Sequence, residues 1–442
     1  MGKAVKRLLL CAAGLLMLFL CGCQPGRDME ELMALPRLSQ EYVELQRALD
    51  AIQAEGASFA APVSGGYRQS VQFYDLNGDG IEEALAFFRR SGERPLKVYI
   101  FIREGRKYSP AAVVEGDGTS IESVSYLDMD GDGWTELAVG WGMGSDLKML
   151  TVYSLKAFQV SPIANADYTQ YTAGDLDGNG HSELLLVRLG NGDKSGEAEL
   201  IGVSRDGETL SASARISEGM ESISRITCAP MPDRKNALYV EGSLQGGLVT
   251  DIFLYEGGIL ESVTLNGDVS EVSFRTSSVG MRDMNGDGIP EIPIPRALPA
   301  QGETVYRALD WYAINSRGLR QLQLSTYHNF SDSWYLILSE DWGGNITIRR
   351  EDSASGERAV VFSRWNGVDK PVTDFLVIYA ISGAGREELA TRPGRQLLAA
   401  SAETVYVYQL LLSRDDWSLA PDDSQLRQSF GLIYSEWISG SN

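Results

Sequence analysis

Histidine and cysteine are scarce in this chain of 442 residues, which contains only 2 His and 4 Cys. Zinc sites are built from clustered His and Cys ligands, and a His-based catalytic triad needs a histidine beside its nucleophile. The two histidines, His181 and His328, stand far apart in the sequence and neither has an evident partner. The sequence therefore predicts no zinc site, no such triad and no other catalytic constellation.

Basic residues are also in short supply, with 39 Lys and Arg against 60 Asp and Glu, a net charge of -21. A protein that binds nucleic acid or anionic lipid through its charge needs a positive surface. The composition excludes both kinds of partner. It predicts a strongly acidic surface that keeps the molecule soluble.

Long hydrophobic runs are limited to one, from Leu8 to Leu20, which follows the basic residues Lys3, Lys6 and Arg7. The run is too short to span a bilayer comfortably and is typical of a signal peptide. It ends in Leu20-Cys21-Gly22-Cys23, which resembles a lipobox.

We therefore expect residues 1–22 to be a lipoprotein signal peptide and Cys23 to carry the lipid after cleavage. The alternative is an uncleaved anchor helix. Either arrangement tethers the protein to a bacterial cell membrane on the extracytoplasmic side. Cys228 is then the only other cysteine of the mature chain, which excludes an internal disulfide and leaves bound ions to brace the fold.

Four segments of nine residues share one pattern: oxygen-bearing side chains at positions 1, 3, 5 and 9, with glycine at position 6. Calcium takes about six to eight oxygen ligands, and a tight loop directs alternate side chains at one centre. Position 7 varies freely, as expected if it offers only its backbone carbonyl. The sequence predicts about four structural Ca²⁺ sites, whose ligands are Asp75, Asn77, Asp79, Ile81 and Glu83; Asp128, Asp130, Asp132, Trp134 and Glu136; Asp175, Asp177, Asn179, His181 and Glu183; and Asp283, Asn285, Asp287, Ile289 and Glu291.

An EF-hand loop begins in the same way, but it needs a bidentate Glu at position 12 and a helix after it. Position 12 is apolar in all four copies, and the first three are followed by strand-like apolar runs. These loops are therefore expected to open β-strands rather than helices.

The first Asp residues of the four loops, Asp75, Asp128, Asp175 and Asp283, are separated by 53, 47 and 108 residues. The last interval equals two repeats, which places a copy without ligands near Ala229 and Ala237. Repeats of about 40 to 50 residues with several short strands each are typical of a propeller. The expected fold class is mainly β: a five-bladed β-propeller with calcium loops, followed by a small α+β domain.

The loop and the strand after it resemble the FG-GAP or VCBS-type repeat, the calcium-loop blade of integrin α-subunit propellers and of many bacterial surface proteins. The resemblance covers about residues 65–327. It implies that each loop joins the first and second strands of a blade and holds one Ca²⁺. The copy near Ala229 departs from the pattern, and Asn179 lowers the charge of the third loop.

These observations predict three units after the signal peptide. Residues 23–63 form a tether and an amphipathic helix from Ser39 to about Glu55, whose apolar stripe is expected to pack on its own domain. Residues 64–327 form the propeller, whose fifth blade carries several prolines and is expected to have a short or edge second strand. Residues 328–442 form the α+β domain of unknown role, with a last helix from Asp423 to Ser439.

The C-terminal domain resembles a small domain appended to secreted proteins of Gram-positive bacteria, through Glu340, Trp342 and Gly344. That resemblance implies no chemistry. Several aromatic residues suit stacking on sugar rings, but their strand positions favour packing: Trp134, Trp141, Trp311, Tyr312, Trp334, Tyr335 and Trp342.

We expect a lipid-anchored extracytoplasmic binding or scaffold protein, with a protein or glycan of the cell envelope as its partner. One alternative is a polysaccharide-binding, lectin-like protein or hydrolase accessory. A further alternative is a hydrolase that uses a carboxylate pair.

Overall fold

The computed structural model describes residues 40–434 except 106, 145, 193, 205–206, 301 and 353–355. The proposed signal peptide and Cys23 lie outside the described residues. In these residues the fold is mainly β and contains six antiparallel sheets. None of the helices in the described part of the chain has the length and hydropathy needed to cross a bilayer.

The first three sheets each contain a four-stranded meander in chain order, and the first sheet has a fifth strand in addition. The first contains β2 (Val71–Tyr74), β3 (Glu83–Arg89), β4 (Leu96–Glu104) and β5 (Lys107–Gly116), with the short β1 (Ser58–Phe59) added against β3. The second contains β6 (Ser120–Leu127), β7 (Glu136–Gly142), β8 (Lys148–Ser154) and β9 (Ser161–Asp167). The third contains β10 (Gln170–Gly174), β11 (Glu183–Arg188), β12 (Glu197–Val203) and β13 (Thr209–Arg215).

The fourth sheet lies where the sequence predicts a copy without a metal loop. It contains β14 (Ser222–Pro230), β15 (Asn236–Leu244), β16 (Gly247–Glu256) and β17 (Ile259–Ser262). A short turn joins β14 to β15, and Ala229 pairs directly with Ala237. In the first three sheets the residue at position 9 pairs instead with the residue before position 1, for example Glu83 with Tyr74. The fourth repeat has therefore kept its strands and lost its loop.

The fifth sheet contains β18 (Ile292–Ala297), β19 (Arg307–Ile314), β20 (Arg320–Asn329), β21 (Trp334–Leu338) and β27 (Phe430–Leu432). Pro293 and Pro295 lie in β18, which is the edge strand, as the prolines predict. The strand that precedes the loop in other sheets is reduced here to a bridge between Arg282 and Glu291. The sheet also extends past the boundary expected at residue 327, because β20 crosses it and β21 pairs with β20.

The C-terminal sheet has the order β22, β23, β24, β26, β25. Its strands are β22 (Ile346–Asp352), β23 (Glu357–Arg364), β24 (Thr373–Ser382), β25 (Gln396–Ala400) and β26 (Thr404–Leu410), with the helices α4 (Arg386–Ala390) and α5 (Asp423–Ser429). The last helix was predicted to continue to Ser439, which is wrong for residues 430–434, and residues 435–439 lie outside the described residues. Phe430 stacks on Trp334, and the chain there pairs with β21 instead of continuing the helix.

Neighbouring sheets pack face to face through shared buried clusters. The second strand of each of the first three sheets is buried on both faces, which explains its continuous apolar sequence. In β11, for example, Leu184 and Leu186 contact the second sheet, whereas Leu185 and Val187 contact the fourth. The repeat therefore extends by stacking one sheet on the next.

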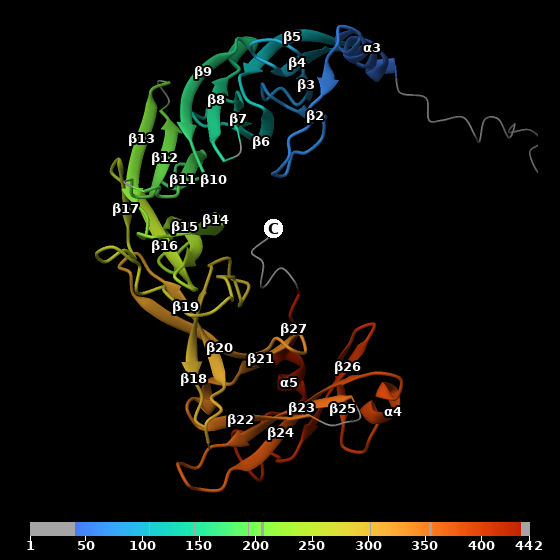
Figure 1. The fold of residues 1–442 in the computed structure, drawn as a ribbon, viewed down its shortest axis with the longest axis vertical. Coiled ribbons are helices and arrows are strands. Elements are labelled where there is room, and N and C mark those ends of the chain that lie inside the picture. The colour runs from blue at the N-terminus through green and yellow to red at the C-terminus, as the bar shows by residue number, and fades with distance from the viewer. Residues whose placement is uncertain are drawn as a thin grey trace, which may run out of the picture.

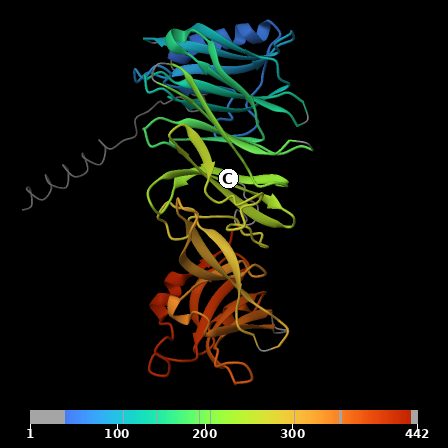
Figure 2. The same ribbon diagram turned by 90° about the vertical axis from the view of Figure 1, so that its left-hand side faces the viewer.

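The five sheets follow an open arc, and the closed ring expected from the sequence is not formed (Figure 1). The helix α3 (Gln40–Ala54) covers the free face of the first sheet, where Leu45 and Leu49 pack on Ala84, Ala86 and Phe88. At the other end, one cluster joins the fifth sheet to the C-terminal sheet. Figure 2 shows the sheets succeeding one another along the long axis. The two faces that would meet in a ring are thus already buried.

Candidate metal loops

The four candidate loops are loop 1 (residues 75–83), loop 2 (128–136), loop 3 (175–183) and loop 4 (283–291). Loops 1 to 3 each connect the first and second strands of their sheet, and the Glu at position 9 is the first residue of the second strand. Loop 4 leads directly into β18. Every loop opens a strand, as the apolar runs after the loops predict.

The Asp at position 1 organises each loop by accepting backbone N–H groups. In loop 1, Asp75 Oδ1 accepts from Gly78 N at 2.8 Å and Oδ2 accepts from Gly80 N at 2.8 Å. Both glycines have positive φ, 71° and 81°, so the turn requires them. The same pair of bonds recurs on Asp128, Asp175 and Asp283.

The side chains at position 5 support the second half of each loop. One oxygen of each accepts the N–H of position 7, at 2.7 to 2.8 Å, on Asp79, Asp132, Asn179 and Asp287. The donors are Ile81, Trp134, His181 and Ile289. Position 7 thus has a fixed backbone and a side chain that is free to vary.

The Glu at position 9 is buried in every copy, with Glu83, Glu136, Glu183 and Glu291 exposed by 5% or less. Its Oε2 accepts the N–H of position 2, for example from Leu76 at 2.9 Å. Burial, above all, raises the pKa of all four carboxyl groups from 4.5 to about 7. Neighbouring Asp carboxylates add to that rise, so a bound cation is the partner that would keep these groups ionised.

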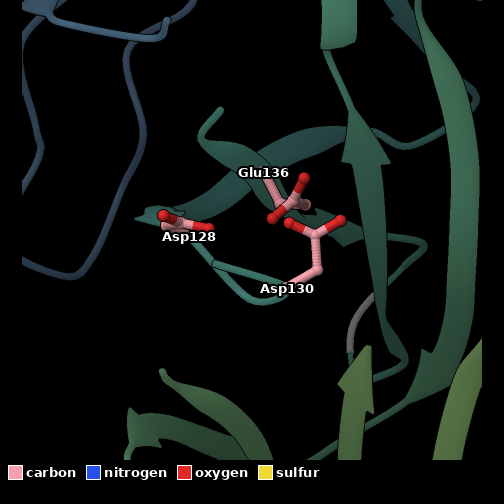
Figure 3. Close-up of side chains that lie close together, drawn as sticks. All are labelled: Asp128, Asp130 and Glu136. Carbon is pink, nitrogen blue, oxygen red and sulfur yellow. The ribbon is translucent and has the colours of Figure 1, made fainter. Parts of the chain in front are cut away.

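Three loops bring three carboxylates within 4.8 Å of one another: Asp128, Asp130 and Glu136; Asp175, Asp177 and Glu183; and Asp283, Asp287 and Glu291. Figure 3 shows this arrangement in loop 2. Loop 1 places the amide Asn77 at position 3, whose Nδ2 donates to Asp79 Oδ2 at 3.1 Å. The predicted carboxylate ligands therefore converge in loops 2, 3 and 4. Loop 1 has the same ligand types as loop 4, Asp, Asn, Asp and Glu, but its three carboxylates do not all lie within this distance of one another.

Glu291 in loop 4 has one carboxylate oxygen whose hydrogen-bonding capacity is unused. Its Oε2 accepts from Met284 N at 2.7 Å, but its Oε1 is buried without a hydrogen-bond partner. An unsatisfied buried carboxylate oxygen is costly. A hard cation held by Asp283, Asp287 and Glu291 satisfies it, so the donor set fits Ca²⁺.

Sequence reasoning missed Lys156, whose Nζ lies 2.6 Å from Asp132 Oδ2. It follows β8, 24 residues from its partner, so no local pattern indicates the contact. It also missed two buried polar groups in the fourth sheet. Arg275 pairs there with Glu241, and Asp251 Oδ2 accepts from Ser217 N at 2.6 Å.

The histidines and tryptophans lie mostly in packing positions. His328 is buried among Trp311, Phe330 and Tyr335, and this burial lowers its pKa to about 3. His181 lies in loop 3. Four of the tryptophans considered for sugar binding are exposed by 3% or less, which confirms the packing interpretation for them: Trp141, Trp311, Trp334 and Trp342.

No protein-family model and no curated protein matches this chain. Similar solved structures include the exotype rhamnogalacturonan lyase YesX, at 12% identity and a TM-score of 0.31, over 70% of this chain and 66% of the lyase. The Bacillus licheniformis rhamnogalacturonan lyase PL11 gives 13% identity and a TM-score of 0.31, over 69% of this chain and 64% of that one. Saccharomyces cerevisiae Sqt1 has 10% sequence identity and a TM-score of 0.31, and the match covers 78% of this chain and 99% of Sqt1. TM-scores this low establish no shared fold with these proteins.

Proposed function

We propose that this protein is a lipid-anchored extracytoplasmic binding or scaffold protein of the bacterial cell envelope. In this proposal its five repeat sheets are blades of the FG-GAP or VCBS type, arranged in an open arc. Ca²⁺ ions bound in the loops brace them. The partner is a protein or glycan of the envelope, and Cys23 carries the lipid.

One observation carries the proposal: the four loops share the hydrogen bonds on the residues at positions 1, 5 and 9 described above, and each buries a Glu at the start of a strand. Without a cation, these buried carboxylates repel the Asp residues beside them. A cation turns that repulsion into attraction, and an ion that binds only the folded state stabilises it. Calcium is thus proposed to be structural.

The test is thermal unfolding of the full-length protein with Ca²⁺ and with a chelator. A site that is saturated at 100 times its Kd adds about 2.7 kcal/mol to the free energy of unfolding. We expect the chelator to lower the Tm and excess Ca²⁺ to restore it, with Mg²⁺ at the same concentration as the control. An unchanged Tm in chelator would overturn the structural role.

The anchor is tested separately by fractionating cells that express the wild type or Cys23→Ser. The lipidated protein is expected in the membrane fraction and to be labelled by a fatty-acid analogue. The variant is expected to lose the label. Equal labelling of both proteins contradicts lipidation at Cys23.

A further inference from the structure

Loops 1 and 2 touch each other, although 53 residues separate their first Asp residues. The backbone N–H of Thr135 donates to the carbonyl of Leu76 at 2.8 Å, and Thr135 Oγ1 donates to the carbonyl of Asp75 at 3.4 Å. Thr135 is position 8 of loop 2, whereas Asp75 and Leu76 are positions 1 and 2 of loop 1. The contact therefore joins ligand-bearing segments of two candidate sites.

The glycines at position 4 show how closely loops 1 to 3 are nested. A Cβ on Gly78 in loop 1 would lie 2.8 Å from the carbonyl oxygen of Gly133 in loop 2. A Cβ on Gly131 in loop 2 would lie 2.2 Å from the His181 ring of loop 3. At the matching Gly178 and Gly286 of loops 3 and 4, a Cβ would meet nothing within 4 Å. The close packing thus runs from loop 1 through loop 2 to loop 3, and loop 4 stands apart.

The hydrogen bond from Thr135 to Leu76 lies close, along the backbone, to the predicted ligands of both loops. Thr135 lies between Trp134 and Glu136, the residues at positions 7 and 9. The peptide of Leu76 is held on both sides, because its carbonyl accepts from Thr135 and its N–H donates to Glu83 Oε2 at 2.9 Å. An ion that fixes positions 7 and 9 of loop 2 thus fixes the N–H that holds Leu76. Leu76 in turn orients the buried carboxylate of loop 1.

We propose that loops 1 and 2 bind their cations as a coupled pair, through the hydrogen bond between Thr135 N–H and the Leu76 carbonyl. This inference rests on the proposed function and specifies how the sites are regulated. An ion in one loop orders the ligands of the other and lowers the entropic cost of the second binding event. Coupling of this kind is reciprocal between the two sites.

Loop 4 provides the substitution that tests the link. Its position 8 is Pro290, so the loop accommodates a residue without an N–H at this position. Thr135→Pro removes the donor to Leu76, whereas Thr135→Val removes only the hydroxyl and keeps the N–H. The two variants therefore separate the backbone bond from the side-chain bond.

Trp134 makes loop 2 observable by itself. It is the residue at position 7, and its ring packs edge-on against Phe158. Tb³⁺ binds at calcium sites and emits when a nearby indole is excited. Emission excited through tryptophan therefore reports an ion bound near Trp134. Its loss in a variant with Asp128→Asn and Asp132→Asn, which disables loop 2, assigns the signal to that loop.

The experiment titrates Tb³⁺ into the full-length protein and into a variant with Asp75→Asn and Asp79→Asn, which disables loop 1. We expect this variant to lower the affinity of loop 2 about five- to tenfold. The control disables loop 4 at the same positions, through Asp283→Asn and Asp287→Asn, and is expected to leave loop 2 unchanged. In the Thr135→Pro background, disabling loop 1 is expected to leave the Tb³⁺ affinity of loop 2 unchanged. In the Thr135→Val background, disabling loop 1 is expected to lower that affinity as it does in the wild type.

The outcomes separate this inference from the proposal beneath it. If Tb³⁺ binds loop 2 with the same affinity whether or not loop 1 is disabled, the proposed coupling is wrong, and the proposal of structural calcium sites is unaffected. If Thr135→Pro retains the dependence on loop 1, the assigned bond is wrong. If neither Tb³⁺ nor Ca²⁺ binds the wild type at all, the proposed function itself is overturned.

Discussion

At the residue scale, Lys156 distinguishes loop 2 from the other loops in the described part of the chain. Its ammonium group lies 2.6 Å from Asp132 and holds the pKa of that carboxyl below its usual range. The contact occupies one carboxylate oxygen of a predicted ligand. In loop 2 the converging carboxylates are those at positions 1, 3 and 9, whereas in loop 4 they are those at positions 1, 5 and 9.

Lys156→Met is therefore expected to raise the Ca²⁺ affinity of loop 2 by about threefold, because an exposed ion pair competes only weakly. Isothermal titration calorimetry measures the change. Lys235→Met is the matched control, since Lys235 is another exposed lysine whose partner, Glu256, is not a predicted ligand. A lower affinity in Lys156→Met would mean that the lysine supports the site instead of competing for it.

His328 makes stability depend on pH in a predictable direction. Burial lowers its pKa from 6.5 to about 3, so the unfolded chain takes up a proton at a higher pH than the folded one does. The stability contributed by the neutral histidine is present above pH 6.5 and is lost as the pH falls toward 3. The slope approaches about 1.4 kcal/mol per pH unit for one proton.

Replacing the group, as in His328→Gln, is expected to flatten the dependence of the free energy of unfolding on pH between pH 6 and 4. Urea denaturation of both proteins at several pH values in this range, with Ca²⁺ present, measures it. Carboxyl groups shared by the two proteins cancel in the difference. Parallel curves would contradict the assignment.

At the scale of elements, α3 acts as a cap for the stacked sheets. Repeat proteins need terminal elements that cover the face of the outermost repeat. Leu45 and Leu49 are exposed by 3% and 4% and pack against the first sheet. The helix was predictable from its apolar stripe, and its packing on its own domain is confirmed.

Disrupting this cap is expected to expose the first sheet and promote self-association. Leu49→Ala should cost about 2 to 5 kcal/mol, the usual range for a buried leucine. Light scattering and chemical denaturation measure the two effects. Arg47→Ala, on the exposed side of the same helix, is the control. An unchanged oligomeric state and stability in Leu49→Ala would contradict the capping role.

The sequence was less informative for elements that are defined by distant partners. The strands that follow loops 1 to 3 were predictable, because turn chemistry and burial on both faces mark them locally. The end of the last helix was not. Phe430 is compatible with a helix in sequence, but its partners Trp334 and Tyr406 lie far away along the chain. The contact between Thr135 and Leu76 was not predictable either, because these residues also lie far apart along the chain.

At the scale of the whole molecule, a mainly β fold of several antiparallel sheets was predictable, and the failure of the ring to close was not. The spacing of the Asp residues indicates five similar units, and five sheets succeed one another in the structure. Closure depends on what covers the two outer faces. Those partners are α3 and the C-terminal sheet, which carry no signal of the repeat.

Small-angle X-ray scattering distinguishes an arc from a ring. A compact chain of 442 residues has a radius of gyration of about 22 Å. The arc in Figure 1 is expected to give a clearly larger value and an asymmetric pair-distance distribution. Samples measured in Ca²⁺ and in chelator show whether the ions influence the curvature. A compact, symmetric distribution would indicate that the ring closes in solution.

The covering of both outer faces has an evolutionary consequence. A closed ring restricts the number of sheets, because adding one sheet changes the angle about the ring axis that every other sheet must occupy. An open arc whose ends are covered by other elements, here α3 and the C-terminal sheet, has no such restriction. When a sheet is duplicated or deleted, only the contacts with its two immediate neighbours must be preserved. Homologues of this protein are therefore expected to vary in length by whole units between conserved ends.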